Sequence, residues 1–217
     1  MIEHGFLGRL PRSVAEEILA SSPRIHYPTG SVGFSEPDGA RLAIVASGIV
    51  RTFMSTGDGR QITIRYAGPG ELVGQLNTNG DGIATTVQAM EPSTLVHLDI
   101  ARMEVIARRH PEVPLVIIDE LAERLRQAYR TLAARAFASV RARVARDLLE
   151  RARVSGRLAA GAGIPVTQQG LADATGSVRE VVARAVSELR RTGAIATRHN
   201  SITILDVETL AGEADYA

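Results

Sequence analysis

Residues 167–191 read TQQGLADATGSVREVVARAVSELRR and predict two short helices separated by a glycine. Thr167 can cap the first helix, because its hydroxyl can accept a hydrogen bond from an unpaired N–H of the first turn. Gly176 can adopt the positive φ angle of a tight turn between helices, and Ser177 can cap the second helix. Apolar side chains then recur every three or four residues and predict a buried face: Val178, Val181, Val182, Ala185, Val186 and Leu189.

Three charged side chains remain near the start of the second helix: Arg179, Glu180 and Arg184. Arg can donate two hydrogen bonds to guanine, and Glu can accept one from the amino group of cytosine. The first turns of a recognition helix reach base edges while the preceding helix crosses the DNA backbone. The two helices therefore predict a DNA-reading helix-turn-helix, with an αα-hairpin carrying a solvated charged face as the alternative.

The segment after these helices predicts a β-hairpin. Residues 193–197 and 202–205 are short runs of strand-forming residues on either side of the polar tip 198–201. A hairpin in this place is typical of a winged helix-turn-helix, and this context favours the DNA-reading interpretation. Residues 139–200 contain 11 Arg against 5 acidic residues, which suits a polyanionic partner.

The composition excludes several classes of site. The chain has 217 residues, 45% of them hydrophobic and 23% charged, as in a soluble globular protein of two domains. It has no cysteine, which excludes disulfides, thiolate metal sites and an iron–sulfur cluster held by this chain. No apolar run approaches the length of a membrane span, and the first residues lack the apolar core of a signal peptide. We expect a cytoplasmic protein that has no membrane partner.

The first half of the chain has the residue pattern of a β-sheet protein. Residues 1–23 predict a short helical segment that precedes the strands. Glycine-rich turns then separate short apolar-alternating runs, which predicts a small β-sandwich or jelly roll. The predicted strands are residues 41–45, 49–54, 61–66, 84–89 and 94–98.

A long helix is predicted over residues 116–138. Its apolar residues are spaced three and four apart, as in the seam of a two-stranded coiled coil: Ile118, Leu121, Leu125, Ala128 and Leu132. An internal core helix would give the same pattern over so few heptads, so the spacing alone leaves both open.

These elements predict an α+β chain with three parts. A β-roll or jelly-roll sensor domain with flanking helices occupies residues 1–111, a long dimerisation helix 112–138, and a winged helix-turn-helix domain 139–217. Ser139 can cap a helix over residues 140–154 and marks the boundary. Residues 155–163 are expected to form a loop, and the acidic tail after Val207 to be loosely held.

This order of parts resembles the CRP/FNR family of bacterial transcription regulators. The most specific matching segments are GELVG at 70–74, AFASVRAR at 136–143 and GSVREVVAR at 176–184. The resemblance implies a homodimer that reads a pseudo-palindromic operator with TGTGA-like half-sites, and RNA polymerase as a further partner. The DNA-binding residues that we predict are Thr167, Gln168, Gln169, Ser177, Val178, Arg179, Glu180, Arg184 and His199.

The resemblance also implies an effector pocket in the roll, formed by Gly74, Gln75, Leu76, Ile83, Ala84, Thr85, Arg124, Ala128 and Tyr129. Members that bind cyclic nucleotides have Glu at the position of Gln75 and an Arg-Ser pair at Ile83-Ala84. Without that cation, a buried cyclic phosphate lacks its charge-assisted partner. We therefore expect no strong cAMP binding, with Arg124 as a cation that could reach the pocket instead. A different small-molecule effector stays open.

Two alternatives remain at the sequence level. His26 and His97 lie on predicted roll strands, and either could ligate haem iron, although no second ligand is evident. A jelly-roll metal enzyme needs clustered histidines and carboxylates, whereas the five histidines here are scattered along the chain. No nucleophile elbow or P-loop lysine is present. We expect no cofactor, no metal and no enzymatic activity.

Overall fold

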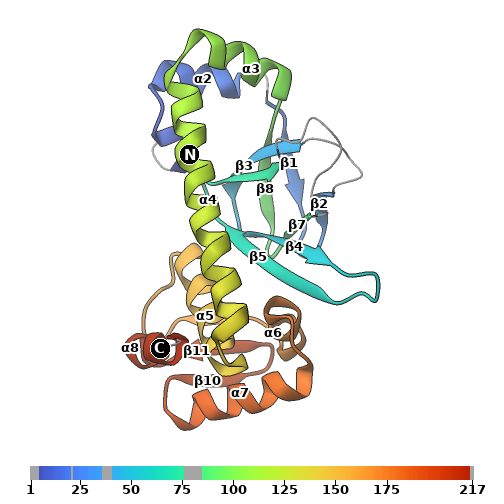
Figure 1. Cartoon of the computed structure of the whole chain (residues 1–217), viewed down its shortest axis with the longest axis vertical. Helices are drawn as coiled ribbons and strands as arrows, with labels where there is room; N and C mark the ends of the chain where they lie inside the picture. The colour runs from blue at the N-terminus through green and yellow to red at the C-terminus, as the bar shows by residue number, and fades with distance from the viewer. Residues whose placement is uncertain (1–4, 21, 36–40, 76–84, 216–217) are drawn as a thin grey trace. The chain divides into compact units, whose positions relative to one another are not determined.

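The computed structural model describes residues 5–20, 22–35, 41–75 and 85–215 (Figure 1). The chain divides into two compact units. The roll unit comprises Met1–Met54 and Arg65–Gln127, and the C-terminal unit comprises Ser55–Ile64 and Ala128–Ala217.

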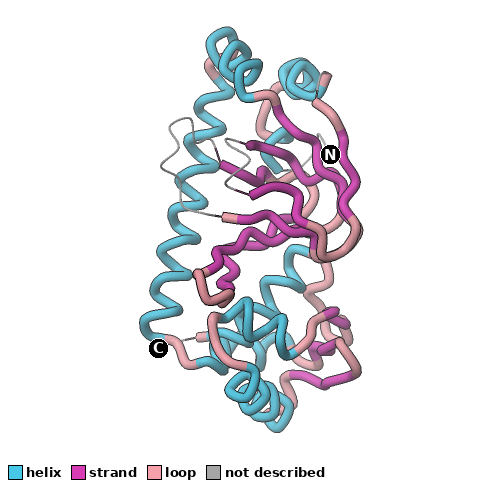
Figure 2. The backbone as a smooth tube through the Cα atoms, turned by 90° about the vertical axis from the view of Figure 1, so that its right-hand side faces the viewer, coloured by secondary structure: helices cyan, strands magenta, loops and turns pink. Residues whose placement is uncertain are grey.

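Two four-stranded sheets form the β-roll. One has the strand order β1-β8-β3-β6 and the other β2-β7-β4-β5. The strands of both sheets are magenta in Figure 2. Side chains from both sheets share one core, which includes Phe34, Val45, Val87 and Leu95. This arrangement confirms the predicted β-roll. The strands are β1 (Arg24–Tyr27), β2 (Val32–Ser35), β3 (Arg41–Ser47), β4 (Val50–Ser55), β5 (Gln61–Ala67), β6 (Leu72–Gln75), β7 (Thr86–Ala89) and β8 (Ser93–Leu98).

Strand β1 lies outside the runs that the sequence pattern predicts, and so do β2 and β6. Strands β2 and β6 have four residues each and contain a glycine, Gly33 or Gly74. A glycine in so short a run removes one of the side chains on which an alternating pattern depends. The hydrogen-bonding partners across the sheets, rather than the local pattern, fix these strands.

Helices cover a second core of the roll unit. They are α1 (Gly5–Gly8), α2 (Arg12–Leu19), α3 (Ile100–Arg109) and the first part of α4 (Glu112–Phe137). Phe6, Leu7 and Val113 are fully buried there against strand residues such as Ile44. The long helix is confirmed and begins earlier than its seam, because Pro114 stands in the first turn, where its missing N–H costs no hydrogen bond.

The C-terminal unit combines helices with a three-stranded sheet, and it confirms the predicted winged helix-turn-helix. Ser139 caps α5, since its hydroxyl accepts a hydrogen bond from Ala142 N at 3.1 Å. The sheet has the order β10-β11-β9. Its third strand was not predicted, because it follows the predicted loop directly and has only three residues. The elements are α5 (Val140–Val154), β9 (Gly163–Pro165), α6 (Gln168–Thr175), α7 (Arg179–Arg191), β10 (Ile195–Arg198), β11 (Ser201–Ile204) and α8 (Val207–Ala214).

The expectation of a loosely held tail after Val207 is wrong. Asp206 caps α8 by accepting hydrogen bonds from Glu208 N and Thr209 N, at 2.9 and 3.1 Å. Leu210 is fully buried in the core of the unit. Burial of Leu210 and Ala214 holds α8 to the core. The acidic composition of the segment gives no sign of this packing.

Candidate nucleic-acid interface

The turn between α6 and α7 forms as the glycine predicts, with one difference at the capping residue. Thr167 Oγ1 accepts a hydrogen bond from Gly170 N at 3.0 Å, so Thr167 caps α6. Gly176 ends α6 with a φ of 62°. Ser177 was expected to cap α7, but Val178 holds that position and makes no side-chain cap bond. The Ser177 N–H instead bonds to Ala172 O at 3.0 Å and closes the end of α6.

Helix α7 has one buried and one exposed face. Val182, Ala185, Val186 and Leu189 are buried in the core of the unit. Val178 is 55% exposed, so the prediction that it belongs to the buried face is wrong. It precedes the helix and does not follow its periodicity. Arg179, Glu180 and Arg184 are all exposed.

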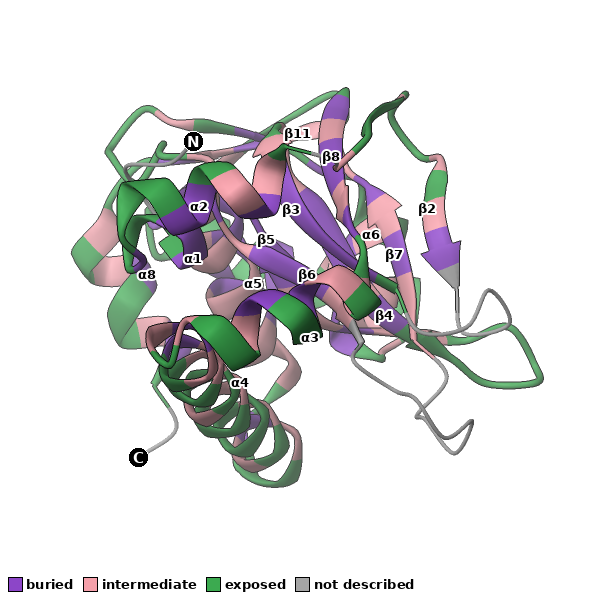
Figure 3. Ribbon diagram, turned by 90° about the horizontal axis from the view of Figure 1, so that it is seen from above, coloured by how far each residue is buried: buried purple, intermediate pink, exposed green. Residues whose placement is uncertain are grey.

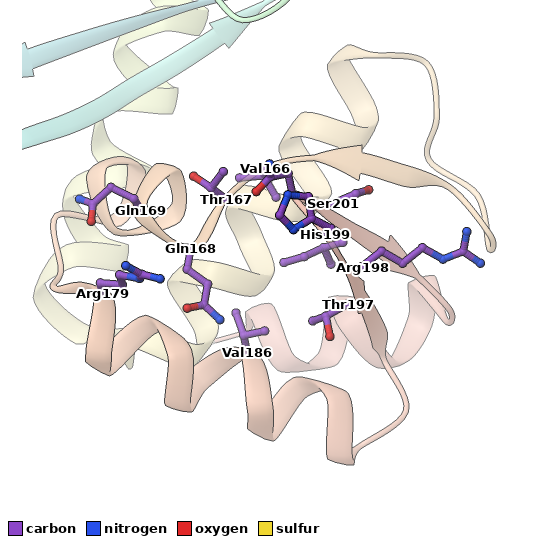
Figure 4. A pocket seen from close by; sticks show the side chains of 12 residues that line it. Val166, Thr167, Gln168, Gln169, Arg179, Val186, Thr197, Arg198, His199 and Ser201 are labelled. Carbon is purple, nitrogen blue, oxygen red and sulfur yellow. The ribbon is translucent and has the colours of Figure 1, made fainter.

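A groove of about 520 Å³ lies between the start of α6, helix α7 and the hairpin β10–β11 (Figure 4). It brings together five of the predicted DNA-binding residues: Thr167, Gln168, Gln169, Arg179 and His199. Figure 4 shows the Gln168 side chain extending from the start of α6 toward α7. Polar residues that sequence reasoning missed also line the groove, and their place in the polar hairpin could have indicated them: Thr197, Arg198, Asn200 and Ser201.

The hairpin has a tight tip. Arg198 pairs with Ser201, which leaves His199 and Asn200 as the two residues of the turn. Asn200 has a φ of 53°, a left-handed conformation that Asn tolerates better than most residues. Its carbonyl accepts a hydrogen bond from Val166 N at 3.1 Å. This bond joins the hairpin tip to the residue just before the cap of α6.

Several arginines of this unit pair with carboxylates. On α5, Arg141 pairs with Glu213 at 2.9 Å, Arg151 with Asp147 at 2.6 Å and Arg153 with Glu150 at 2.7 Å. Within the described part of the chain, Arg179 and Arg184 have no carboxylate at ion-pair distance. The exposed face of α7 therefore carries uncompensated positive charge, which is what attracts a polyanion.

The predicted effector-pocket residues are placed only in part. Leu76, Ile83 and Ala84 lie outside the described residues, as does the side chain of Gln75. Thr85 directly precedes β7, and Ala128 and Tyr129 are on α4, with Tyr129 62% exposed. The structure brings Gly74 and Arg124 together, since Arg124 Nη1 donates a hydrogen bond to Gly74 O at 3.2 Å.

The two candidate haem ligands both contact protein groups. His97 Nε2 lies 2.9 Å from the Tyr27 hydroxyl, and His26 Nδ1 lies 2.9 Å from Thr94 Oγ1. Burial lowers the pKa of His97, and the nearby charge of Arg41 lowers it further. Among the described residues no three His, Asp or Glu side chains cluster as metal ligands would.

Of the helices in the described residues, α4 is the longest, with 26 residues. None of them is both long and apolar enough to cross a membrane.

Two family models match the chain. The Crp-like helix-turn-helix domain matches residues 142–212, and the cyclic nucleotide-binding domain matches residues 24–110. The transcriptional regulator LdrP of Thermus thermophilus is 33% identical over 172 residues, covering 78% of this chain and 85% of the relative. The CRP-like cAMP-activated global transcriptional regulator of Mycobacterium tuberculosis is 30% identical over 218 residues, covering 96% and 95%.

Solved structures share the fold. A putative regulator of the crp/fnr family from Eubacterium rectale has a TM-score of 0.78 at 20% identity and covers 99% of both chains. A CRP/FNR-family transcriptional regulator of Thermus thermophilus has a TM-score of 0.75 at 26% identity and covers 90% of this chain and 100% of the other.

Proposed function

This chain belongs to the CRP/FNR family of transcriptional regulators, and from that premise we propose that it is a homodimer that reads a pseudo-palindromic operator without cAMP. Each protomer inserts the start of α7 into one TGTGA-like half-site. The bound dimer then acts on transcription together with RNA polymerase.

The observation that carries the DNA-reading proposal is the exposed face of α7. Arg179, Glu180 and Arg184 are exposed in the first half of the helix, whereas Val182, Ala185, Val186 and Leu189 are buried. The two guanidiniums can each donate a pair of hydrogen bonds to a guanine, and the carboxylate can accept one from a cytosine. Thr167 and Gln168, at the start of α6, border the same groove and can contact the phosphates on either side.

A second copy of the chain is supported by the outer face of α4. Ile118, Leu121, Leu125 and Leu132 are between 51% and 64% exposed, and much of the helix is green in Figure 3. These residues keep the three-and-four spacing of a coiled-coil seam. So much exposed apolar surface on one helix marks an interface, and a self-complementary seam fits an identical helix.

Independence from cAMP is supported by the state of Arg124. Its guanidinium donates to Leu72 O at 2.6 Å and Gly74 O at 3.2 Å, and it pairs with Glu120 at 3.2 Å. A phosphate would have to displace these partners to use this cation. The alternative function is a cAMP-dependent regulator, which the name of the Mycobacterium tuberculosis relative favours.

Binding to a random duplex tests the DNA-reading surface directly. The fluorescence anisotropy of a labelled random-sequence pool would be titrated with the wild type and with R179A/R184A at several salt concentrations. We expect the wild type to bind, and the logarithm of its affinity to fall steeply with that of the salt. The variant should bind more weakly and show a shallower salt dependence. A wild type that does not bind duplex DNA at any salt concentration would overturn the proposal.

A further inference from the structure

Strand β6 lies at the edge of its sheet, beside the long helix α4. In the part of the roll that the structure describes, β6 is the last strand of the sheet β1-β8-β3-β6. The carbonyl of Glu71, just before β6, accepts a hydrogen bond from Val45 N on β3. Backbone groups alternate in direction along a strand, so the carbonyls of Leu72 and Gly74 point away from β3. An edge that carries such groups needs partners when it is covered.

Arg124 supplies those partners from the long helix α4. Its Nη2 donates to Leu72 O at 2.6 Å and its Nη1 to Gly74 O at 3.2 Å. One planar guanidinium therefore bridges two successive outward carbonyls, which the single ammonium of a Lys could not do in the same way. Gly74 is required at this point, because its φ is +98° and an added Cβ would lie 2.1 Å from Arg41 O.

Two carboxylates and two further arginines surround Arg124. Glu120, one turn earlier on α4, is 3.2 Å from Arg124 and 2.6 Å from Arg9. Arg65 lies 3.8 Å from Glu120 and 3.9 Å from Glu71, and it also donates to Leu72 O at 3.3 Å. Burial lowers the pKa of Arg124, as does the charge of Arg65, while Glu120 raises it. The carboxylates thus offset the cost of burying the two cations.

This contact matters because the apolar packing of α4 ends before it. Val113 and Val116 are buried in the roll core and Ile117 packs against it. From there until Ala134, no residue of α4 is buried. Glu120 and Arg124 continue the roll-facing side of the helix for two more turns. Leu121 and Leu125, beside them, remain exposed for the second copy.

We propose that Arg124 is a positioning residue that takes the place of an effector: it holds α4 against β6 with no small molecule bound, so that the dimer-forming, DNA-binding state is the resting state. The proposal rests on the proposed function, since it explains why that function needs no ligand. In this proposal Arg124 acts through the position of α4.

The test compares R124A with wild type and with R126A, whose arginine is exposed on the same helix and pairs with Glu123 at 2.6 Å. Dimerisation is measured by sedimentation equilibrium, and specific DNA binding by anisotropy on a duplex selected with the wild type, all without ligand. We expect R124A to weaken both by roughly tenfold or more, as losing charged hydrogen bonds predicts, and R126A to match the wild type.

A chemical rescue experiment distinguishes the proposed positioning role of Arg124 from a general effect of the substitution on folding. A low, non-denaturing concentration of guanidinium chloride should restore binding by R124A, because the free ion can occupy the vacated site, whereas equal NaCl should not. R124K should bind with intermediate affinity, and it decides the test if R124A does not fold. The inference is overturned if R124A and R124K both behave like R126A, or if the wild type binds DNA only with a cyclic nucleotide. A wild type that binds no DNA contradicts the proposed function itself.

Discussion

At the scale of single residues, the proposed base-reading residues are all exposed on helix α7. Helix α7 exposes Arg179, Glu180 and Arg184 and buries Val182, Ala185, Val186 and Leu189. The three side chains start from different positions along the helix, so each would contact a different base pair. Their contributions to base discrimination should therefore be separable by substitution.

Replacing Arg184 with Ala should cost about 1–3 kcal/mol per half-site and relax the preference at one base pair, because a bidentate contact to guanine is lost. The measurement is a titration of the selected operator and of its single-base variants. Arg190→Ala, at the exposed end of the same helix, is the matched control. Unchanged discrimination in R184A would mean that α7 does not read bases through this residue.

His97 makes the stability of the roll depend on pH. Its pKa in the folded protein is below its ordinary value of 6.5, so the unfolded chain binds a proton more readily. The neutral His97 side chain therefore contributes fully to the stability of the fold above pH 6.5, and this contribution is lost as the pH falls through the lower pKa of the folded protein. The urea midpoint of the wild type should therefore fall more steeply on acidification than that of His97→Asn. His26→Asn, on exposed β1, is the control. Parallel curves for wild type and His97→Asn would contradict the prediction.

The roles of some residues in the helix-turn-helix could be predicted from the sequence, because these roles depend on local backbone geometry. Thr167 and Gly176 act as the sequence indicates, since a cap and a left-handed turn depend on a few neighbouring atoms. Ser177 and Val178 could not be assigned correctly, because the bond from Ser177 N to Ala172 O shifts the start of α7 by one residue. The partners of Arg124 lie on a strand some fifty positions away, and no spacing in the sequence reveals them.

At the scale of elements, α4 and α8 show opposite relations between pattern and environment. The seam of α4 has a strong apolar spacing, yet within one chain most of it is exposed. Helix α8 has a weak pattern, yet its two buried residues, Leu210 and Ala214, belong to a core. Periodicity predicts which side of a helix is apolar and leaves open what covers that side.

Replacing Leu125 with Glu should separate the dimer, because it places a charge in the centre of the proposed seam. Specific DNA binding should be lost with it, since operator spacing reflects the two-fold symmetry of the protein. Sedimentation velocity measures the first effect and anisotropy the second. Leu158→Glu, at a leucine that is 47% exposed outside α4, is the control. A variant at Leu125 that sediments as an unaltered dimer would remove α4 from the interface.

Replacing Leu210 with Ala should destabilise the C-terminal unit by about 2–5 kcal/mol, because it opens a cavity under α8. Urea unfolding followed by circular dichroism gives the change in the free energy of unfolding. Leu205→Ala, at a side chain that is 48% exposed, should change it little. Equal effects of the two substitutions would show that α8 contributes no more to the core than an exposed loop does.

At the scale of the whole molecule, the fold could be predicted from the order of its parts. Strand-rich, long-helical and helix-turn-helix segments each have their own periodicity, and together they indicate the α+β arrangement. The short strands β2, β6 and β9 could not be predicted, because pairing across the sheet specifies them. In the proposed function, the roll holds α4 without a ligand, the α4 seam binds a second copy, and each α7 reads one half-site.

The central claim, a symmetric operator read without cAMP, is tested most directly by selecting random duplex DNA with the purified protein in the presence and absence of cAMP. We predict a two-fold symmetric consensus with TGTGA-like half-sites, enriched equally in both conditions. Enrichment that requires cAMP, or a consensus with a single half-site, would contradict the account.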